Sequence, residues 1–370
     1  MGHSIHYMLF FIVIIMYKIE TKISDSYMLI NDCHIADNKL TQFIDNMDEA
    51  LDVCIQNNVK YLLIGGDLFE ARASQPLSVL ITVKNVLEKF TKNNISVIMV
   101  NGNHDKVNQE SNYGYCHVFN TIEDVTVIDE FGVIETPNAN IFILAYFPEI
   151  GSLKDKVKAI EGTDEFSNGK ANILYAHAGV LEALGTKNKN EINAQTFSKF
   201  NNVYMGHYHN RSKFGKNIEY IGSSRQFSYG EDEEKGYNIC NSYGELTFIK
   251  NKVNDRYITI QHSFKKINEL PDVVNKILNN NDEVKYNIRC IIKATKTTKD
   301  SVDVDKIQKM GVDKVIVETN ERKVESESST LYEKLDTEQI KIAYSEFCSE
   351  IKENDNLGLQ YLSKINVNLN

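Results

Sequence analysis

The chain has 370 residues, of which 42% are hydrophobic and 25% are charged, and its formal net charge is −10. This balance excludes a disordered tail protein, a collagen-like fibre and an integral membrane protein. The length is too great for one compact core, so we expect two domains with smaller attachments.

The negative charge lies entirely in the front part of the chain. Residues 1–245 contain 21 Lys and Arg against 31 Asp and Glu, whereas the remaining residues contain 20 of each. An acidic surface does not attract DNA by its charge alone, unless bound metal ions supply a positive field. DNA binding by this chain would therefore depend on metal ions.

The cysteines and the N-terminus both bear on where the protein works. Six cysteines lie far apart with no C-x-x-C pair, which predicts a reducing cytoplasm (that of the host if the protein is viral). The apolar run Met8–Tyr17 is too short to span a bilayer, and its flanks lack the features of a signal peptide. We interpret residues 1–27 as an N-terminal extension, with Met28 opening the first domain; a cleaved or anchoring signal is the alternative.

From residue 28 the sequence alternates strand-like and helix-like segments. Apolar residues between 38 and 57 recur at helical spacing, and the run Tyr61–Ile64 has the length of a buried strand. Pro76 suits the first turn of a second helix, and residues 95–100 follow as another strand. This pattern predicts a sheet with parallel neighbours and helices on its face.

The rest of the chain predicts a second sheet, a smaller α/β unit and a C-terminal helix. Short strand-like pieces between 126 and 145 indicate the second sheet, and the acidic run 231–234 is expected to be a solvated loop. A Ser/Glu-rich linker follows at 324–330, and residues 340–351 carry one apolar helical stripe. The strands of the smaller unit are expected at 256–264, 286–294 and 312–318.

Five strand-like runs end directly in polar residues that can bind a metal ion. The carboxyl ends of parallel strands form a shared crevice, so these residues are expected to converge although they are distant in sequence. A lone histidine is more often part of a core, and Asn-His-Asp is compatible with a simple turn. Their common position after strands favours one metal site over these alternatives. The candidate ligands are Asp32, His34, Asp67, Asn103, His177, His207 and His209.

The types of these side chains favour a pair of divalent cations. Two carboxylates, one amide and four imidazoles suit Mn²⁺, Fe or Zn²⁺ better than Ca²⁺, and seven ligands are too many for one tetrahedral ion. Asp67 can bridge two ions, which at a separation of roughly 3.5–4 Å can activate water and hold a phosphate. His104 is the candidate general acid, with Asp105 orienting it or raising its pKa. We expect Cys33 to pack in the core and to be inert.

The order of these motifs resembles the signature of the calcineurin-like metallophosphoesterases. The segments 66–76, 220–224 and 230–237 resemble those of SbcD-type recombination and repair nucleases. The length and the acidic, Ser-rich linker look most like the recombination endonuclease subunit of T-even phages. The resemblance covers about residues 28–351, and its motifs are Asp32-x-His34, Gly66-Asp67, Gly102-Asn103-His104-Asp105, His177 and Gly206-His207-x-His209.

The resemblance implies an α/β (α+β) fold, namely a four-layer α-β-β-α sandwich over residues 28–250. It implies a DNA-capping domain over 251–323 and, within 324–370, a linker and a helix that binds an SbcC-type coiled-coil ATPase. It also implies a homodimer formed through the front domain. The implied ligands of one Mn²⁺ are Asp32, His34, Asp67 and His209, and those of the second are Asp67, Asn103, His177 and His207.

One residue departs from the SbcD-type pattern. Many of these enzymes carry histidine where this chain has Glu70, and a carboxylate cannot donate a proton at neutral pH. The balance between exonuclease and endonuclease activity is therefore open. Four basic residues near the last motif can either contact phosphates or lie as solvated surface charge, namely Arg211, Lys213, Lys216 and Arg225.

Our leading hypothesis is a Mn²⁺-dependent DNA nuclease subunit that hydrolyses phosphodiester bonds in recombination or repair, together with an ATPase partner. A second hypothesis keeps the chemistry but changes the substrate to a small phosphodiester or phosphomonoester. A third is a non-catalytic scaffold for DNA ends. The domain after residue 250 argues against the second hypothesis, and the complete set of candidate ligands argues against the third.

Overall fold

The computed structural model describes residues 16–22, 24–185, 188–279 and 284–319, together with Ser345 and Cys348. The helix expected at 340–351 and the linker before it therefore lie outside the described residues, apart from those two positions. Contacts divide the chain into one unit of residues 1–292 and 303–316 and another of residues 293–302 and 317–370. Within the described part, no helix has the length and apolar character needed to cross a bilayer.

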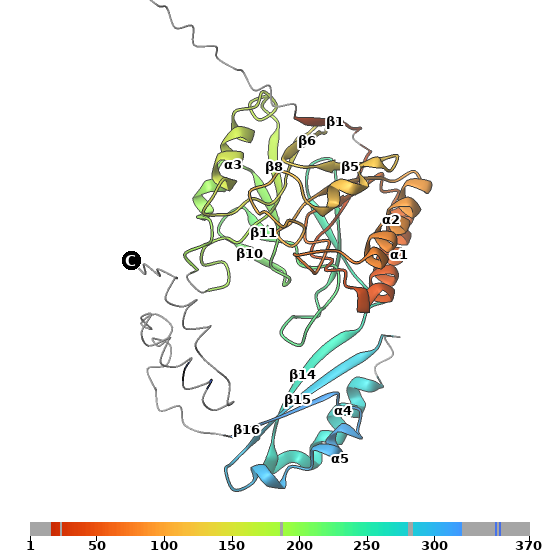
Figure 1. Cartoon of the computed structure of the whole chain (residues 1–370), viewed down its shortest axis with the longest axis vertical. Coiled ribbons are helices and arrows are strands. Elements are labelled where there is room, and N and C mark those ends of the chain that lie inside the picture. Colours follow the sequence, from red (N-terminus) through yellow and green to blue (C-terminus); the bar gives the residue numbers. More distant parts are fainter. Residues whose placement is uncertain are drawn as a thin grey trace, which may run out of the picture. The chain divides into compact units, whose positions relative to one another are not determined.

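A six-stranded sheet, of which Figure 1 labels strand β5, carries the first three site motifs. Its order is β13-β12-β2-β3-β4-β5, and the last four of these strands run parallel, as predicted from the alternating pattern. Strand β12 pairs antiparallel with β2 and with β13. The strands are β2 (Tyr27–Ile30), β3 (Tyr61–Ile64), β4 (Ser96–Val100), β5 (Val125–Ile128), β12 (Gly236–Cys240) and β13 (Leu246–Lys250).

Both faces of this sheet are covered, which explains its uninterrupted apolar strands. In β2, Tyr27 and Leu29 belong to the core shared with the second sheet. Their neighbours Met28 and Ile30 face the other way and pack with residues of helices α1 (Leu40–Gln56) and α2 (Leu77–Lys92). These helices confirm the two predicted between the strands, and Pro76 caps α2 from just outside its first turn.

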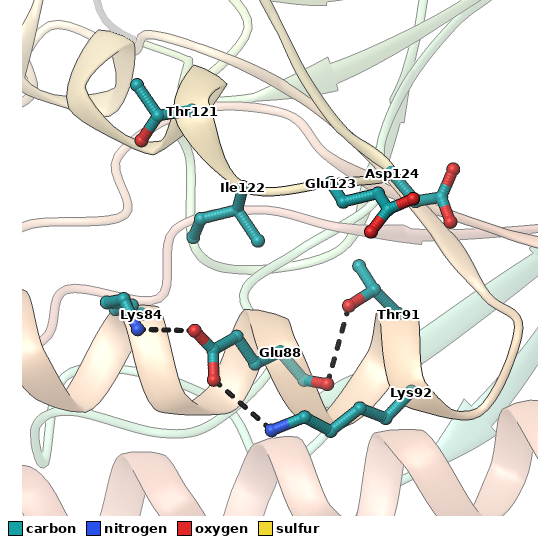
Figure 2. A pocket seen from close by; sticks show the side chains of 8 residues that line it. All are labelled: Lys84, Glu88, Thr91, Lys92, Thr121, Ile122, Glu123 and Asp124. Carbon is teal, nitrogen blue, oxygen red and sulfur yellow. Dashed lines mark hydrogen bonds and ion pairs between the residues drawn. The ribbon is translucent and has the colours of Figure 1, made fainter.

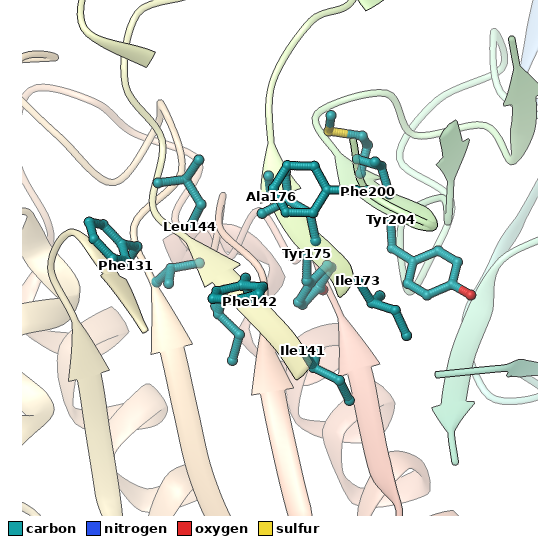
Figure 3. Packing of buried hydrophobic residues seen from close by; sticks show 14 of the residues in the cluster. Phe131, Ile141, Phe142, Leu144, Ile173, Tyr175, Ala176, Phe200 and Tyr204 are labelled. Carbon is teal, nitrogen blue, oxygen red and sulfur yellow. The ribbon is translucent and has the colours of Figure 1, made fainter. Parts of the chain in front are cut away.

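A seven-stranded sheet forms the third layer, in the order β1-β6-β7-β8-β9-β11-β10. Figure 3 shows buried side chains of this sheet, among them Phe142 and Tyr175, together with Phe200 from the segment before β9. Helix α3 (Leu153–Glu161) covers the outer face through Leu153, Val157 and Ile160, which completes a four-layer α-β-β-α sandwich. The strands are β1 (Tyr17–Glu20), β6 (Phe131–Glu135), β7 (Ala139–Leu144), β8 (Ala171–His177), β9 (Asn202–Gly206), β10 (Ser212–Phe214) and β11 (Ile218–Tyr220).

Two expectations about these sheets need correction. The segment 126–145 divides between them, because β5 joins the first sheet and only β6 and β7 join the second. Residues Tyr17–Glu20, expected in an N-terminal extension, form β1 and pair in parallel with β6. Lys18 of this strand forms ion pairs with Glu135 and Glu165, so the folded part begins upstream of Met28.

A smaller three-stranded sheet follows residue 250, as expected for the smaller α/β part of the chain. Its order is β14-β15-β16, and the observed strands agree with the predicted ones to within two residues at each end. Short 3-10 helices elsewhere are η1 (Asp37–Lys39), η2 (Tyr115–Thr121) and η3 (Ala194–Phe197). The elements of this part are β14 (Arg256–Ser263), η4 (Phe264–Glu269), α4 (Leu270–Leu278), β15 (Tyr286–Ala294), η5 (Lys299–Ser301), α5 (Val304–Gln308) and β16 (Lys314–Thr319).

All six cysteines are free and buried. Burial raises the pKa of the Cys33 thiol to about 12, so this side chain stays protonated at neutral pH although it lies between Asp32 and His34. The position agrees with the expectation that Cys33 packs rather than binds an ion.

The fully buried Tyr175 offers a test of how the two sheets are joined. Its hydroxyl, on β8, donates to the carbonyl oxygen of Ile30 on β2 at 3.0 Å. Tyr175→Phe should lower the stability by about 1 kcal/mol, because one buried hydrogen bond is lost. In a thermal melt this corresponds to roughly 2–4 °C. Tyr243→Phe is the control, since that side chain is 56% exposed; equal midpoints for both variants would contradict the assignment.

Candidate metal centre

All seven predicted ligands lie at the carboxyl ends of strands, where the two sheets meet. Each of these polar side chains lies at the end of its strand or within four residues after it. The seven are Asp32 and His34 after β2, Asp67 after β3, Asn103 after β4, His177 at the end of β8, and His207 and His209 after β9.

One half of the centre consists of Asp32, His34 and His209. Their ligand atoms lie within 4.8 Å of one another. The Nε2 atoms of His34 and His209 face each other at 3.1 Å, and His34 Nε2 lies 3.7 Å from Asp67 Oδ2. Two ring nitrogens that face each other need a shared proton or a cation between them. This arrangement fits a divalent ion.

The other half consists of His177, His207 and Asn103 around the same Asp67. His177 Nε2 lies 3.3 Å from Asp67 Oδ2. One terminal atom of the Asn103 amide lies 3.1 Å from His177 Nε2 and 3.2 Å from His207 Nδ1. Asp67 thus stands between both halves, as a bridging carboxylate must. The donor set of imidazole nitrogens with carboxylate and amide oxygens fits Mn²⁺, Fe or Zn²⁺.

Burial and mutual charge set the protonation of this cluster. Burial alone would raise the pKa of Asp67, but the charge and hydrogen bond of His177, followed by the charge of His34, hold that pKa below its usual range. Burial lowers the pKa of His207 to about 4, with the charge of His177 acting in the same direction. The carboxylate is therefore ionised and the His207 ring is neutral at pH 7, which are the forms that bind metals.

The backbone at the ligands adopts rare conformations. Asp32, His34, Asp67 and His207 all have positive φ angles, of 52°, 43°, 49° and 91°. Such angles cost a non-glycine residue about 1–3 kcal/mol and persist only where the surroundings enforce them. Here the enforcing contacts are backbone hydrogen bonds between the loops, from Asp32 N to Gly66 O and from His34 N to Asp67 O, both at 3.0 Å.

Two glycines allow these loops to approach closely. Gly66 has a φ of +102°, and a Cβ on it would lie 2.8 Å from the Cα of Gly102. A Cβ on Gly102 would in turn collide with the backbone nitrogen of Asp67. Larger residues at either position would push the β3 and β4 loops apart and move Asp67 away from Asn103.

His104 stands at the rim of the centre. Its backbone nitrogen donates to Asp67 Oδ1 at 2.8 Å, and its ring packs edge-on against that of His34 with 4.7 Å between centroids. Its Nδ1 lies 2.7 Å from the carbonyl oxygen of Glu70. A carbonyl oxygen only accepts, so Nδ1 carries a proton, and Nε2 can pass a proton to a substrate when the ring is doubly protonated.

The expectation that Asp105 orients His104 is wrong. The Asp105 carboxylate is fully buried and accepts hydrogen bonds from three backbone nitrogens, those of Gly102 (2.7 Å), Phe69 (2.9 Å) and Leu68 (3.3 Å). The chain turns back after Gly102, so this carboxylate points into the loop after β3. Asp105 joins the β3 and β4 loops, and it is the carbonyl of Glu70 that contacts the His104 ring.

Comparison with known proteins identifies the family of this centre. A family model described as Calcineurin-like phosphoesterase matches residues 26–211, which is half of the chain. The chain belongs to this family. Calcineurin-like phosphoesterases are hydrolases that use two divalent metal ions, in agreement with the clustered potential ligands of this centre.

Individual relatives of this phosphoesterase are distant. The "Putative phosphoesterase 244L" of Invertebrate iridescent virus 6 is 26% identical over 221 residues, covering 58% of this chain and 72% of that protein. The DNA double-strand break repair protein Mre11 of Methanocaldococcus jannaschii is 27% identical over 221 residues, covering 54% of this chain and 58% of that protein. A solved dimetal phosphatase from Danio rerio aligns with a TM-score of 0.41 at 10% identity, covering 59% of this chain and 92% of that chain. The predicted resemblance is confirmed for the family, with Mre11 homologues at low identity.

The four basic residues near the last motif of this phosphoesterase lie in different environments. Arg225 is buried and donates to the carbonyl oxygens of Cys33 (3.1 Å) and His34 (3.0 Å), so it holds the first ligand loop and is not a surface charge. Arg211 is bound to Asn238 and Glu219. Lys213 and Lys216 are exposed. Their spacing in the sequence gave no sign of this difference.

Three further residues contact the centre, and only one of them, Glu70, stood out in the sequence, as a departure from the SbcD-type pattern. The Asn103 amide has one end toward the imidazoles and the other toward Arg72. With its oxygen at the second end, it accepts a hydrogen bond from Arg72 Nη2 at 2.6 Å. Glu70 Oε2 lies 2.9 Å from His34 Nδ1. Glu231, expected in a solvated loop, is only 12% exposed in its side chain and contacts His209 Nδ1 at 3.1 Å. The motif of residues 66–76 contained Arg72 and Glu70, but nothing in it indicated these contacts.

A pocket elsewhere on the surface contains none of these residues. It lies between α2 and residues 121–124 (Figure 2). Three of its charged side chains pair with one another, since Glu88 binds both Lys84 and Lys92. His207 and His209, in contrast, line a surface pocket together with Leu184, Tyr208, Asn210 and Glu231.

The central position of Asp67 predicts how metal ions stabilise the protein. An ion at 100 times its Kd stabilises the folded state by about 2.7 kcal/mol. Mn²⁺ should therefore raise the melting midpoint of the wild type, by roughly 2–4 °C for each kcal/mol. Asp67→Asn should lose most of this shift, because the bridging charge is removed.

His117→Ala is the matched control for this experiment. That histidine is 46% exposed in its side chain and pairs with Asp129, away from the centre. It should keep the full shift in a thermal melt with and without Mn²⁺. An equal shift in Asp67→Asn and wild type would show that the ions bind elsewhere.

Proposed function

We propose that this chain is a Mn²⁺-dependent DNA exonuclease and endonuclease subunit that hydrolyses phosphodiester bonds in DNA end processing, recombination and repair. The convergence of seven ligand side chains, with His104 beside them, carries this proposal. The names of the Mre11 relatives, as DNA double-strand break repair proteins, support the choice of DNA as substrate.

The side chains at the centre divide the work among them. When bound, two divalent cations activate water and neutralise charge on the phosphate. Asp32, His34, Asp67 and His209 would hold one cation, and Asp67, Asn103, His177 and His207 the other. As the doubly protonated imidazolium, His104 passes a proton from Nε2 to the leaving oxygen while its Nδ1–H donates to the Glu70 carbonyl oxygen. The exposed Arg72 guanidinium, next to Asn103, is placed to bind a phosphate oxygen.

Other parts of the chain supply the interactions that a DNA enzyme needs. The three-stranded unit after residue 250 would cap and guide the DNA. The helix predicted at 340–351 would bind an SbcC-type ATPase, and the front domain would form a homodimer, in a cytoplasmic complex. These parts distinguish DNA from a small substrate, because a phosphatase for small esters requires none of them.

A small-molecule phosphodiesterase is the second candidate function. The excess of acidic residues before residue 246 favours it, since such a surface repels the DNA backbone. Glu70 favours it as well, because its carboxylate beside His34 is half exposed and negatively charged. The substrate panel below separates the two functions.

The His104→Ala variant tests the proposed chemistry. Purified protein should be incubated with linear duplex, plasmid and p-nitrophenyl esters, with Mn²⁺ or Mg²⁺. The wild type should cut DNA with Mn²⁺, and His104→Ala should lose about 10²–10⁴-fold in rate, since a general acid is missing. The variant should still bind Mn²⁺ and DNA.

The outcomes distinguish all three hypotheses, with His117→Ala as the surface control. Cleavage of p-nitrophenyl esters without cleavage of DNA would contradict the nuclease and support the small-molecule enzyme. DNA binding without any cleavage by the wild type would support a scaffold. Full activity in His104→Ala would remove this residue from the mechanism.

A further inference from the structure

Two carboxylates stand behind the two histidines of one half of the centre. Glu70 Oε2 lies 2.9 Å from His34 Nδ1, and Glu231 Oε1 lies 3.1 Å from His209 Nδ1. The opposite nitrogens of these rings, both Nε2, face each other at 3.1 Å. Each ring therefore spans the distance between a carboxylate outside the centre and the ligand position inside it.

The other half is supported differently. His177 turns Nδ1 to the carbonyl oxygen of Gly65 at 3.2 Å, a neutral acceptor. His207 points Nδ1 inward, toward Asn103. The two negative charges of Glu70 and Glu231 thus belong to the half formed by Asp32, His34 and His209.

The surroundings strengthen this pair of contacts. The Phe227 ring packs against both His34 (5.3 Å between centroids) and His209 (5.2 Å), so it shields both imidazoles from water on one side. Electrostatic interactions gain strength where water is excluded. A carboxylate behind a ligand histidine fixes which nitrogen carries the proton, orients the ring and raises the basicity of the nitrogen that binds the ion.

We infer that Glu70 and Glu231 are positioning residues, which present His34 and His209 to a divalent cation and strengthen that half of the centre alone. The inference rests on the two-cation centre of the proposed function. It gives Glu70 a role that does not require a proton to donate, because its carboxylate lies 2.9 Å from the outer nitrogen of a ligand ring.

The two carboxylates differ in how firmly they are held. The Glu231 side chain is 12% exposed and also accepts from the backbone nitrogen of Phe227 at 3.2 Å. The Glu70 side chain is 56% exposed, and His34 Nδ1 has no hydrogen bond of good geometry despite the short distance. A fixed partner orients its ring better than a mobile one. Glu231→Gln should therefore weaken the binding of the cation more than Glu70→Gln does.

Calorimetric titration of the metal-free full-length chain with Mn²⁺ tests this inference. The wild type should bind two ions. Glu231→Gln should weaken one of them about 10- to 100-fold and leave the other unchanged, as loss of a residue behind a metal ligand commonly does. Asp32→Asn should lower the affinity for the same ion, and His177→Ala should lower the affinity for the other. Glu234→Gln is the matched control from the same acidic run, because its side chain is 59% exposed and paired with Lys250.

Several results would overturn the inference. Unchanged binding of both ions in Glu231→Gln and Glu70→Gln would do so, and so would equal weakening of both ions. Circular dichroism should confirm that each variant folds; if Glu231→Gln does not, Glu70→Gln with a smaller but selective loss carries the test. If the wild type binds two ions, the variants weaken the binding of only one of them, and the wild type cuts no DNA, the proposed function is refuted and the inference stands.

Discussion

The crowding of buried carboxylates and imidazoles around Asp67 is the constraint on which the rest of this structure depends. Its carboxylate lies 3.3 Å from His177 and 3.7 Å from His34, and the same His34 nitrogen faces that of His209 at 3.1 Å. Such a cluster is costly in a protein interior unless a cation or shared protons compensate it. The fold brings the polar ends of five strands together here. The free-energy cost of burying them is therefore the condition for a metal-binding centre.

Much of the surrounding structure acts to hold these side chains in place. Asp105 connects the loops after β3 and β4, while Arg225 grips the carbonyls of Cys33 and His34 from a distant part of the chain. Glu231 reaches back to His209 from a segment beyond the family match, which ends at residue 211. Four ligand residues keep rare backbone angles, and backbone hydrogen bonds between the loops after β2 and β3 help to hold them. The geometry of the centre therefore depends on contacts that several separate segments of the chain make with the ligand loops.

The amino-acid sequence predicted the parts of this architecture that depend on local patterns. Tyr61–Ile64 and Tyr286–Ala294 were predicted as strands with the observed bounds, because apolar runs bounded by turns are distinctive. The ligands were found because each directly follows a strand. Asp105 was misassigned because its direction depends on how the loop turns after Gly102. Strand β1 and Glu231 were missed since only tertiary contacts, with β6 and with His209, order them.

Anomalous diffraction from a crystal grown with Mn²⁺ is the most direct test of the central claim. Our account predicts two anomalous peaks in one pocket, the first among Asp32, His34 and His209 and the second among Asn103, His177 and His207, with Asp67 contacting both. A crystal with saturating Mn²⁺ that shows no peak there, or peaks only at surface carboxylates, would contradict the account.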